Sequence, residues 1–359
     1  VVMVKRLSDA ERDGDRILGV IASGAENHGG YAGSLTAPNV KAQAKLIETA
    51  MKGIDPQAIS FIETHGTGTA LGDPVEINGL KRAYENCTLV CDSLTDAFDQ
   101  IAILLPSFST KQTKTITDDA KRPLEISLPE DTTQAYDMRL VIGEVFDRES
   151  FREFWAEDKL PLLVGLAKLD GQTVGVIADN PQIESGAQNI QSIQKFTRLN
   201  RFCERFGFPI VELSDSPAFR PGEEQEHGGI QGVGGRSIRE ECLNVLPKVA
   251  VTLRQNYGGR YIHANLITLG YPRVGVVVEG AKIGVMGAKG AVGVLYGKKL
   301  IALPEAKRAE AEAKWQKEYE DNQLNPEHAQ KLGYVEKPVA LKDLRSSIAS
   351  HLARLKNNL

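Results

Sequence analysis

The chain has 359 residues, a length that suits two domains or one α/β domain with an appendage. Its 42% hydrophobic and 25% charged residues are close to the globular average, which excludes wholesale disorder and collagen-like repeats. The 43 Lys and Arg residues against 47 Asp and Glu residues give a formal net charge of −4. This balance gives no reason to expect a nucleic-acid partner, which needs clustered basic charge.

The sequence also argues against a membrane protein and against a metal site. No apolar run approaches the ~20 residues of a membrane span, and the N-terminus lacks the order of a signal peptide. The cysteines fit no zinc-ligand spacing and are too sparse for a disulfide scaffold; they are Cys87, Cys91, Cys203 and Cys242. We therefore expect a cytoplasmic protein that holds no metal.

The first part of the chain alternates apolar segments with glycine-rich loops. The pattern predicts strands at residues 16–23 and 59–63, helices at 40–52 and 76–84, and loops at 24–36 and 65–74. After residue 86 the composition changes: residues 94–105 are expected to form a helix, and residues 106–132 a polar surface segment.

From residue 136 onward, strands alternate with helices. The predicted strands are 162–169, 173–178, 209–213, 248–254 and 273–278, and the predicted helices are 148–155, 188–206, 236–246, 303–322 and 342–356. Strands and helices that alternate in this way indicate a layered α/β domain.

The most specific string in the first part is ETHGTGTALGDPVE at residues 63–76. A histidine in a loop of small residues after a strand can present its imidazole as a hydrogen-bond donor or an acid/base, although a glycine-rich turn can also hold a histidine without a function. The whole string resembles the second active-site motif of polyketide-synthase β-ketoacyl synthases. Further matches to that family, in order, are residues 5–9, 13–15, 27–30, 35–39 and Gln43.

Residues 1–86 thus resemble an incomplete, thiolase-like interior fragment of a ketosynthase, in which His65 matches a catalytic histidine. Condensation needs a thiolate nucleophile and two imidazoles. The resemblance places the nucleophilic cysteine upstream of this region and a second histidine motif a few dozen residues after Tyr84, where none exists. We therefore expect no ketosynthase activity and interpret Cys87 and Cys91 as ordinary thiols.

Residues 88–359 resemble another family, on motifs that follow one another in collinear order. These are residues 136–139, Asp147 with Phe151, 165–167, 174–181, 195–198, 202–206, Pro209, 215–219, 221–230, 247–249, 257–259, 283–292, 325–326, 333–335 and Arg345. They resemble the C-terminal half of the carboxyltransferase β subunit of biotin-dependent acyl-CoA carboxylases, which implies a crotonase-like fold. The expected organisation is a ketosynthase fragment at 1–86, a connecting segment at 87–135 and a carboxyltransferase domain at 136–359.

The carboxyltransferase resemblance gives the string YGGRY at residues 257–261 a chemical role. Carboxyl transfer passes through enolate-like oxyanions, which paired backbone N–H groups stabilise. The resemblance implies that Gly259 and Arg260 donate to biotin, and that Tyr257, Gly258, Gly234 and Gly235 also belong to its binding site. Arg260 replaces a small residue, so we expect its long side chain to stand at the mouth and block or redirect biotin. Ile262 falls where the family tunes its acyl-chain preference.

Several other features leave alternatives open. The glycines of residues 228–235 precede the helix predicted from residue 236, and they form either a ligand loop or a flexible connector. Residues 215–217 are expected to be a strand-end turn, and Cys203 a core residue. The remaining histidines, His227, His263, His328 and His351, lack ligand spacing and are expected in solvent or in the core. Glu279 and Gly280 replace the Trp-Pro pair of the family on the substrate side.

The resemblance implies a carboxyltransferase half-domain that binds carboxybiotin on a carrier protein and helps to convert a short acyl-CoA, of acetyl or propionyl type, into a malonyl-type extender unit for polyketide or fatty-acid synthesis. The implied partners are a biotin carboxyl carrier protein, a biotin carboxylase, and either a second copy of the chain or a separate N-terminal half that carries the acyl-CoA site. We expect no activity from this chain alone. The alternatives are a non-catalytic interaction or scaffold protein, a fusion remnant, or an artefact in the joining of two genes near residues 86–88.

Overall fold

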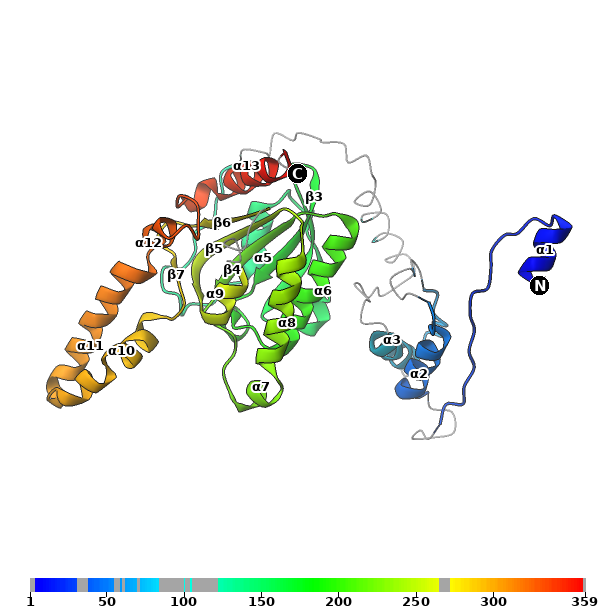
Figure 1. Ribbon diagram of the computed structural model, residues 1–359, viewed down its shortest axis with the longest axis horizontal. Coiled ribbons are helices and arrows are strands. Elements are labelled where there is room, and N and C mark those ends of the chain that lie inside the picture. The colour runs from blue at the N-terminus through cyan, green and yellow to red at the C-terminus, as the bar shows by residue number, and fades with distance from the viewer. Residues whose placement is uncertain are drawn as a thin grey trace. The chain divides into compact units, whose positions relative to one another are not determined.

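The computed structural model describes residues 4–30, 38–54, 59, 62–69, 72–83, 100, 104, 122–264 and 272–357. The chain divides into two compact units, Val1–Val90 and Cys91–Leu359 (Figure 1). Cys87, Cys91 and almost all of the helix expected at residues 94–105 lie outside the described residues.

The described helices of the first unit are α1 (Leu7–Asp13), α2 (Val40–Ala50) and α3 (Gly72–Ala83). α2 begins after Asn39, whose side chain accepts hydrogen bonds from the first backbone N–H groups of the helix, and it confirms the helix expected at residues 40–52. α3 begins four residues earlier than predicted. The hydroxyl of Thr69 accepts a hydrogen bond from the N–H of Gly72 at 2.9 Å, which caps this earlier start.

The strand expected at residues 16–23 is wrong. The backbone there joins no sheet, and its apolar side chains lie in solvent: Leu18 is 88% exposed and Ile21 77% exposed. A strand needs a neighbour for its N–H and C=O groups, and the described residues of this unit provide none. Residues 59, 62 and 63 of the second expected strand are not in a strand either.

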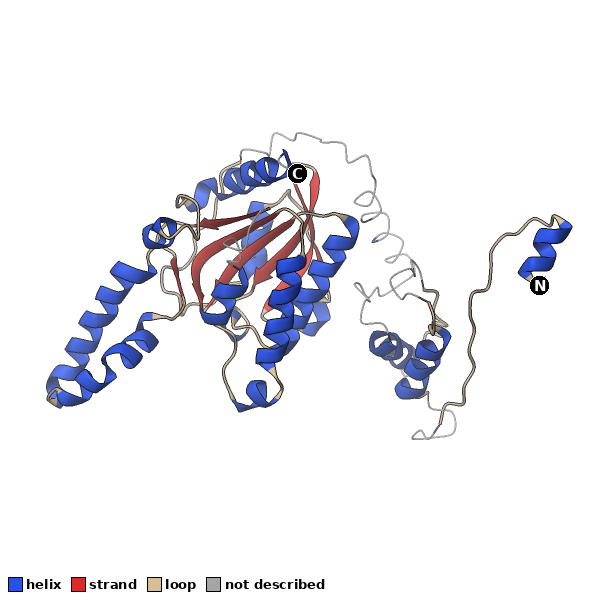
Figure 2. Cartoon of the chain, in the orientation of Figure 1, coloured by secondary structure: helices blue, strands red, loops and turns tan. Residues whose placement is uncertain are grey.

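The described strands of the second unit form one seven-stranded sheet (Figure 2). The strands are β1 (Arg152–Phe154), β2 (Leu162–Leu169), β3 (Gln172–Asp179), β4 (Ile210–Ser216), β5 (Lys248–Tyr257), β6 (Arg273–Val277) and β7 (Lys282–Gly284). Their order is β1-β2-β3-β4-β5-β6, and β7 pairs with the end of β5. β2 pairs antiparallel with both β1 and β3, while β3 to β6 run parallel.

The predicted strands at 162–169, 173–178, 209–213, 248–254 and 273–278 are all confirmed, within three residues at each end. The helix expected at residues 148–155 is wrong, because β1 occupies that segment. Gly165 of β2 explains the pairing: a Cβ there would lie 2.0 Å from the carbonyl oxygen of Arg152, so only glycine allows β1 to approach this closely.

Helices cover both faces of the sheet (Figure 1). The α-helices are α5 (Met138–Val145), α6 (Ile190–Phe206), α7 (Glu223–His227), α8 (Ile230–Leu243), α9 (Gly258–Ala264), α10 (Ala288–Ala302), α11 (Glu305–Tyr319), α12 (Pro326–Lys331) and α13 (Leu344–Asn357). Short 3₁₀ or π turns are η4 (Ala156–Asp158), η5 (Glu184–Gly186), η7 (Glu320–Leu324) and η8 (Leu341–Asp343). α5 and α13 pack on one face, and α6, α8 and α9 on the other.

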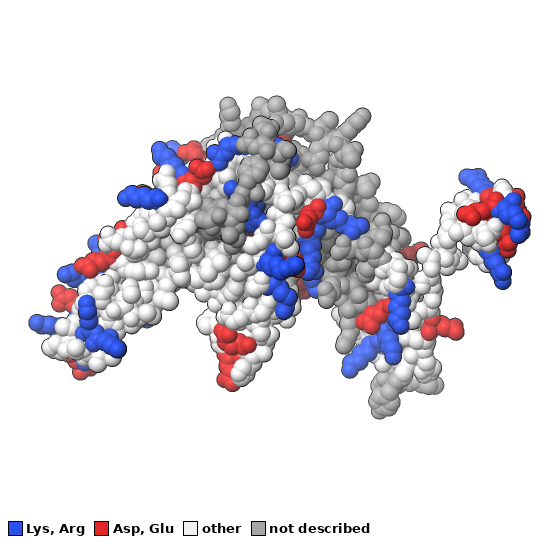
Figure 3. Space-filling view, in the orientation of Figure 1, with Lys and Arg blue, Asp and Glu red and all other residues white. Residues whose placement is uncertain are grey.

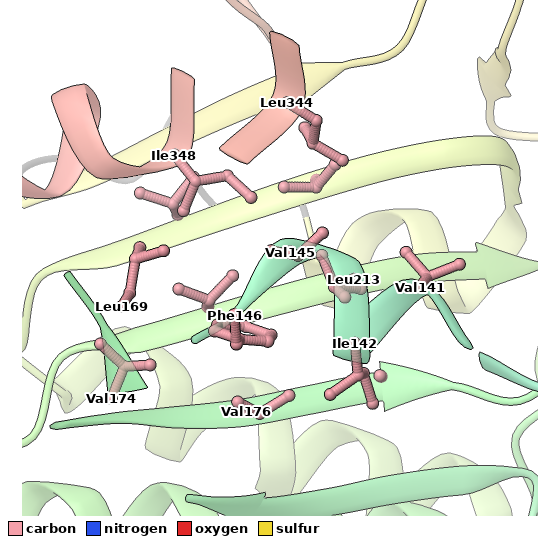
Figure 4. Packing of buried hydrophobic residues seen from close by; sticks show 14 of the residues in the cluster. Val141, Ile142, Val145, Phe146, Leu169, Val174, Val176, Leu213, Leu344 and Ile348 are labelled. Carbon is pink, nitrogen blue, oxygen red and sulfur yellow. The ribbon is translucent and has the colours of Figure 1, made fainter. Parts of the chain in front are cut away.

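The apolar core lies between the sheet and the pair α5 and α13 (Figure 4). Alternate residues of the parallel strands, such as Val174 and Val176 of β3, point toward Phe146 and Ile348, and all four are fully buried. Leu124 is also buried in this core, and Ile126 and Leu128 pack against it. Residues 122–132 therefore lie on the surface of the domain, as expected, but insert alternate apolar side chains into its core.

α11 and the η7 turn together confirm the helix expected at 303–322, within two residues at each end. α10 at Ala288–Ala302 is a helix that the sequence pattern did not predict, and Pro304 separates it from α11. α13 confirms the helix expected at 342–356. Its Arg345 is completely buried and donates to the carbonyl oxygen of Val145 and to the carboxylates of Asp147 and Asp170, which fixes α13 over the β2–β3 hairpin.

Candidate functional site

The turn between β5 and α9 lies at the edge of the sheet where the parallel strands end. β5 finishes at Tyr257, and α9 begins at once with Gly258, whose φ of +60° suits glycine. Gly258 and Gly259 are half-buried, so their backbone is open to a ligand. The first N–H groups of a helix have no partner within that helix. The turn therefore presents N–H groups that have no partner within α9 at this edge.

Phe219 packs directly against this turn. A Cβ on Gly259 would lie 2.7 Å from Cδ2 of the Phe219 ring, and a Cβ on Gly234 would lie 2.9 Å from its Cε2. Both glycines therefore allow α8 and α9 to close on the same aromatic ring. The main chain of Phe219 is fixed in turn by Gln188, which bonds to the residues on either side of it.

Tyr257 forms the inner wall of the turn. Its ring packs 3.6 Å from the Cβ position of Gly287 and joins a small cluster with Ala288 and Leu324. Burial raises the pKa of the Tyr257 hydroxyl above its usual value, so the side chain stays neutral at physiological pH.

The expectation that the Arg260 side chain stands at the mouth of the site is wrong. Arg260 is completely buried, and its guanidinium points beneath the turn toward carboxylates of two strands. Its Nε lies 3.0 Å from both oxygens of Asp179, and its Nη1 bonds to Glu212. The side chain therefore leaves the mouth open, and Gly258 and Gly259 are the half-buried residues of the turn.

Arg260 belongs to a buried ionic network between the sheet and the α6–α8–α9 layer. Its members are Asp179, Glu212, Glu241, Lys248, Arg260 and Arg273. Lys248 Nζ lies 2.5 Å from Glu212 and 2.9 Å from Glu241, and Arg273 lies 2.6 Å from Glu241. Three cations thus face three carboxylates, and each of these side chains is at most 8% exposed. Figure 3 shows a separate set of surface charges, such as the acidic tip at α7.

The environment shifts the pKa values of the network strongly. Burial works to raise the pKa of Glu212, but attraction to Arg260 and Lys248 outweighs it and lowers that pKa to about 2. Complete burial raises the pKa of Asp179 to about 6 in spite of Arg260. Burial, and then repulsion from Arg260, lowers the pKa of His263 to about 3, so this histidine is neutral.

Phe196 of α6 is the apolar floor of the network. Its ring centroid lies 4.0 Å from that of His263, 4.9 Å from Lys248 Nζ and 5.9 Å from the guanidinium carbon of Arg260. His263 also bonds through Nε2 to the Ser237 hydroxyl at 2.9 Å. The histidine expected in solvent or in the core is therefore a core residue with a polar partner.

A second ionic cluster fixes the segment before α5 to the same sheet edge. Asp215 accepts hydrogen bonds from Arg254 Nε at 2.6 Å and from the Tyr136 hydroxyl at 2.7 Å. Arg254 also donates to the carbonyl oxygens of Pro129, Asp131 and Gln134. Asp215 lies inside β4, which ends at Ser216, so the turn expected at residues 215–217 starts later than predicted and Asp215 is a structural anchor.

The glycines of residues 228–235 do not open a helix at residue 236, as expected. α8 already begins at Ile230, so Gly234 and Gly235 lie inside it. Gly234 is buried against Phe219, whereas Gly235 is exposed and has nothing within 4 Å of a Cβ position. Residues 230–235 are therefore helical and form neither of the two loops considered for this segment, and Gly234 allows α8 to pack against Phe219.

The other predicted residues occupy separate places. Ile262 lies on α9 and is 46% exposed. His65 belongs to the first unit, where the Glu76 carboxylate accepts hydrogen bonds from the N–H groups of His65 and Gly66 at 2.7 and 3.0 Å, and the histidine is exposed. Cys203 is fully buried, as expected. In the described part of the chain, no group of His, Cys, Asp or Glu has an arrangement suited to a metal ion, and no helix is long and apolar enough to cross a membrane.

The network cannot be read from the sequence because its members come from distant segments. Asp179 and Lys248 fall within the motifs at 174–181 and 247–249, but the resemblance implies no role for either. Glu212 lies in the middle of an apolar strand, and a charged residue at such a position is the signal that a partner must be buried beside it.

Comparison with known families accounts for both parts of the chain. Residues 95–359 match the carboxyl transferase domain model, and residues 18–93 match the model of the beta-ketoacyl synthase C-terminal domain. The chain is 33% identical over 271 residues to the biotin-dependent acetyl-/propionyl-coenzyme A carboxylase beta6 subunit of Mycobacterium bovis, covering 75% of this chain. It is 32% identical over 308 residues to the propionyl-CoA carboxylase beta chain of Cereibacter sphaeroides, covering 85% of this chain. The chain spans 57% of the length of each of these relatives.

Solved structures agree with these relatives. The crystal structure of transcarboxylase 12S with methylmalonyl-coenzyme A and methylmalonic acid bound superposes with a TM-score of 0.66 at 31% identity, over 75% of this chain and 53% of that one. A single-chain, multi-domain long-chain acyl-CoA carboxylase shares the fold, with a TM-score of 0.63 at 18% identity, over 86% of this chain and 29% of that one. The second unit therefore has the expected crotonase-like carboxyltransferase fold, and the first is the expected thiolase-like ketosynthase fragment.

Proposed function

Because the chain belongs to the carboxyl transferase domain family, we propose that its second unit is the biotin side of an acyl-CoA carboxyltransferase. The observation that carries the proposal is the accessible turn at Gly258 and Gly259, whose N–H groups meet no partner within α9. Carboxybiotin, brought by a carrier protein, would supply the carboxyl group. The N–H groups of the turn would hold its ureido oxygen and stabilise negative charge there.

The turn suits this role because side chains pack closely around it and no cationic side chain stands in front of its N–H groups. Phe219 packs on one side, Tyr257 stays neutral behind it, and the Arg260 guanidinium is withdrawn beneath it. Donors held in place before the charge develops stabilise it more than donors that must reorient. Gly259 lies in the accessible turn and is also one of the two N–H donors that the sequence predicts. We propose that Arg260, the other predicted donor, contributes through its side chain.

The substrate class follows from the relatives, which are named as acetyl-/propionyl-CoA and propionyl-CoA carboxylase subunits. We propose a short acyl-CoA of this type as the acceptor and a malonyl-type product. Ile262, half-exposed on α9 next to the turn, is the residue that we expect to tune the acyl chain. The ketosynthase fragment makes polyketide or fatty-acid synthesis in the cytoplasm the setting that we propose.

The proposed partners are a biotin carboxyl carrier protein, a biotin carboxylase, and a surface that completes the acyl-CoA site. α10 supports the last of these: Val294 and Ile301 are 75% and 73% exposed along one helix. The backbone oxygen of Val285, just before α10, lies 3.8 Å from the Cβ position of Gly258. An exposed apolar helix face that starts beside the site suits contact with a second copy or with a separate carboxyltransferase half.

A titration of the ¹⁵N-labelled chain with free D-biotin tests the proposal directly. We expect the largest chemical-shift changes at the amides of Gly258 and Gly259, with smaller ones around Phe219. Gly259→Ala, which places a methyl group on the Phe219 ring, should weaken the binding, whereas Gly235→Ala should leave it unchanged. Changes confined to other parts of the chain, or none at millimolar biotin, would contradict a biotin site at this turn.

A second candidate is a non-catalytic interaction or scaffold protein that remains from a fusion. The ketosynthase segment favours it, because His65 has an exposed position and a carboxylate-braced loop but no thiolate partner among the described residues. Incubation with an acyl thioester followed by mass spectrometry tests whether the ketosynthase fragment still forms a covalent acyl intermediate. We expect no acylated cysteine, and an acyl adduct on Cys87 or Cys91 would show that the fragment retains ketosynthase chemistry.

A further inference from the structure

We propose that Arg260 is a positioning residue: its buried side chain ties the Gly258–Gly259 turn to the strands below and so fixes the direction of the N–H donors. This inference rests on the proposed function of the turn. It concerns the side chain of Arg260, whose charge lies beneath the donors rather than in front of them.

The contacts of the guanidinium join α9 to two neighbouring strands. Nε lies 3.0 Å from both oxygens of Asp179 at the end of β3, and Nη1 bonds to Glu212 in β4. Asp179 is itself held: it accepts hydrogen bonds from Gln188 Nε2 at 2.8 Å and from the backbone N–H of Asp215 at 3.2 Å. A planar guanidinium that donates to fixed carboxylates from two of its edges can adopt only one orientation. A lysine ammonium in its place could rotate.

The tether continues into β5 and α8. Lys248, the first residue of β5, lies 2.5 Å from Glu212 and 2.9 Å from Glu241 of α8. The turn is therefore connected through charged contacts to both ends of the strand that carries it. Because Arg260 follows Gly259 directly, a rotation of the first turn of α9 would pull the guanidinium away from both carboxylates in a fully buried position, where losing a partner is costly.

The network offers a way to separate positioning from mere stability. Removing Arg260 alone leaves Asp179 as a buried carboxylate without its cation. Removing both Arg260 and Asp179 keeps the charges balanced, because Glu212 still pairs with Lys248, and Glu241 still pairs with Lys248 and Arg273. The double variant should therefore fold nearly as well as the wild type, yet lack the tether.

The experiment compares four chains: the wild type, Arg260→Met, Arg260→Met with Asp179→Asn, and Arg354→Met. Arg354 makes an exposed pair with Glu336 and is the matched control for the loss of one arginine. Three quantities are measured. The first is amide hydrogen exchange at residues 261–264, whose N–H groups bond back to the turn in α9. The second is the Kd for free D-biotin, and the third is the urea midpoint, which reports the stability of each chain.

We expect the double variant to regain the urea midpoint of the wild type, while exchange at residues 261–264 stays at least tenfold faster and biotin binds at least tenfold more weakly. Arg354→Met should match the wild type in all three measurements. A double variant with wild-type exchange and wild-type biotin affinity would overturn the positioning role and leave Arg260 as a stabilising residue only. If the wild type itself binds no biotin, the proposed function fails, and the exchange rates alone still decide whether Arg260 anchors the turn.

Discussion

Both faces of the sheet in the unit Cys91–Leu359 are covered by helices, but only one of them carries a buried ionic network. The face under α5 and α13 is filled by aliphatic and aromatic side chains such as Phe146, Val176 and Ile348 (Figure 4). The face under α6, α8 and α9 holds the buried ionic network, with Glu212 and Lys248 at its centre.

The apolar face contributes most of the stability of the domain, whereas the ionic face fixes the orientation of the elements packed on it. Apolar burial contributes free energy in proportion to area and has no preferred direction. A buried ion pair contributes little net stability against an apolar replacement, but losing one partner is costly, and its geometry is fixed. The directional face is the one that carries α9 and the turn at Gly258 and Gly259.

The largest effect is expected from Glu212→Gln. This change leaves Arg260 and Lys248 facing each other in a dry interior with too few carboxylates. We expect it to lower the free energy of unfolding by about 3–5 kcal/mol, measured by urea denaturation. Glu212→Gln with Lys248→Met removes one charge of each sign and should recover most of that loss. A double variant as unstable as the single one would show that packing, rather than charge balance, governs this face.

On the apolar face, Ile348→Ala should cost about 3 kcal/mol, because a fully buried side chain leaves a cavity that its neighbours only partly fill. The matched control is Ile301→Ala on α10, where the side chain is 73% exposed and the change should stay within about 0.5 kcal/mol. Equal losses for both variants in urea denaturation would mean that α13 does not cover the core as described.

The pH dependence of stability should separate the two faces next. Because burial and Arg260 lower the pKa of His263 from 6.5 to about 3, the folded chain resists a proton that the unfolded chain takes up below about pH 6.5. Stability from neutral His263 is complete above that pH and falls by ~1.4 kcal/mol per pH unit as the pH drops toward about 3. The excess stability of the wild type over His263→Gln should therefore shrink from pH 7 to pH 5.

This difference between two chains cancels the effect of Asp179, whose raised pKa acts with the opposite sign between about pH 4 and pH 6. Urea midpoints at pH 7, 6 and 5 provide the measurement. An excess stability that does not change with pH would mean that His263 titrates alike in the folded and unfolded chains.

The smallest effect concerns the glycines of α8. Gly234→Ala brings a methyl group to 2.9 Å from the Phe219 ring, so overpacking should outweigh the better helix propensity of alanine and destabilise by about 1 kcal/mol. Gly235→Ala, exposed and without contacts, should stabilise by up to about 1 kcal/mol. Thermal melts of the two variants should move in opposite directions; a shift of both to higher temperature would contradict the packing of α8 on Phe219.

The sequence predicted the strands of the second unit well because each is a short apolar run with a clear end. Residues 162–169 match β2 at both ends. The same signal failed at residues 16–23, since an apolar run shows that a segment can be a strand but not that a neighbour pairs with it. The start of α8 was predicted too late because glycine has a low helix propensity. Gly234 is nevertheless helical, since tertiary packing against Phe219 leaves no room for a side chain there.

For the candidate site, the string at 257–261 located the turn, but its electrostatics could not be predicted. The direction of the Arg260 side chain depends on Asp179 and Glu212, which lie 81 and 48 positions away in the chain. A local motif shows that the arginine follows the glycines in the chain. It does not show whether the arginine side chain points into solvent or into the interior of the domain. Parallel strand order and a register shared by β3, β4 and β5 bring these groups together.

The most direct test of the central claim is reconstituted carboxyl transfer. Acyl-CoA carboxylation is measured with biotin carboxylase, ATP, bicarbonate and a biotinylated carrier, with and without a separately expressed acyl-CoA-binding half of a carboxyltransferase. We predict no turnover by this chain without that half, measurable turnover with it, and its loss in Gly259→Pro, which deletes one N–H donor of the kind that is worth roughly 10²–10³ in rate. Steady carboxylation without the added half, or wild-type turnover by Gly259→Pro, would contradict the account of this turn as the biotin side of a divided site.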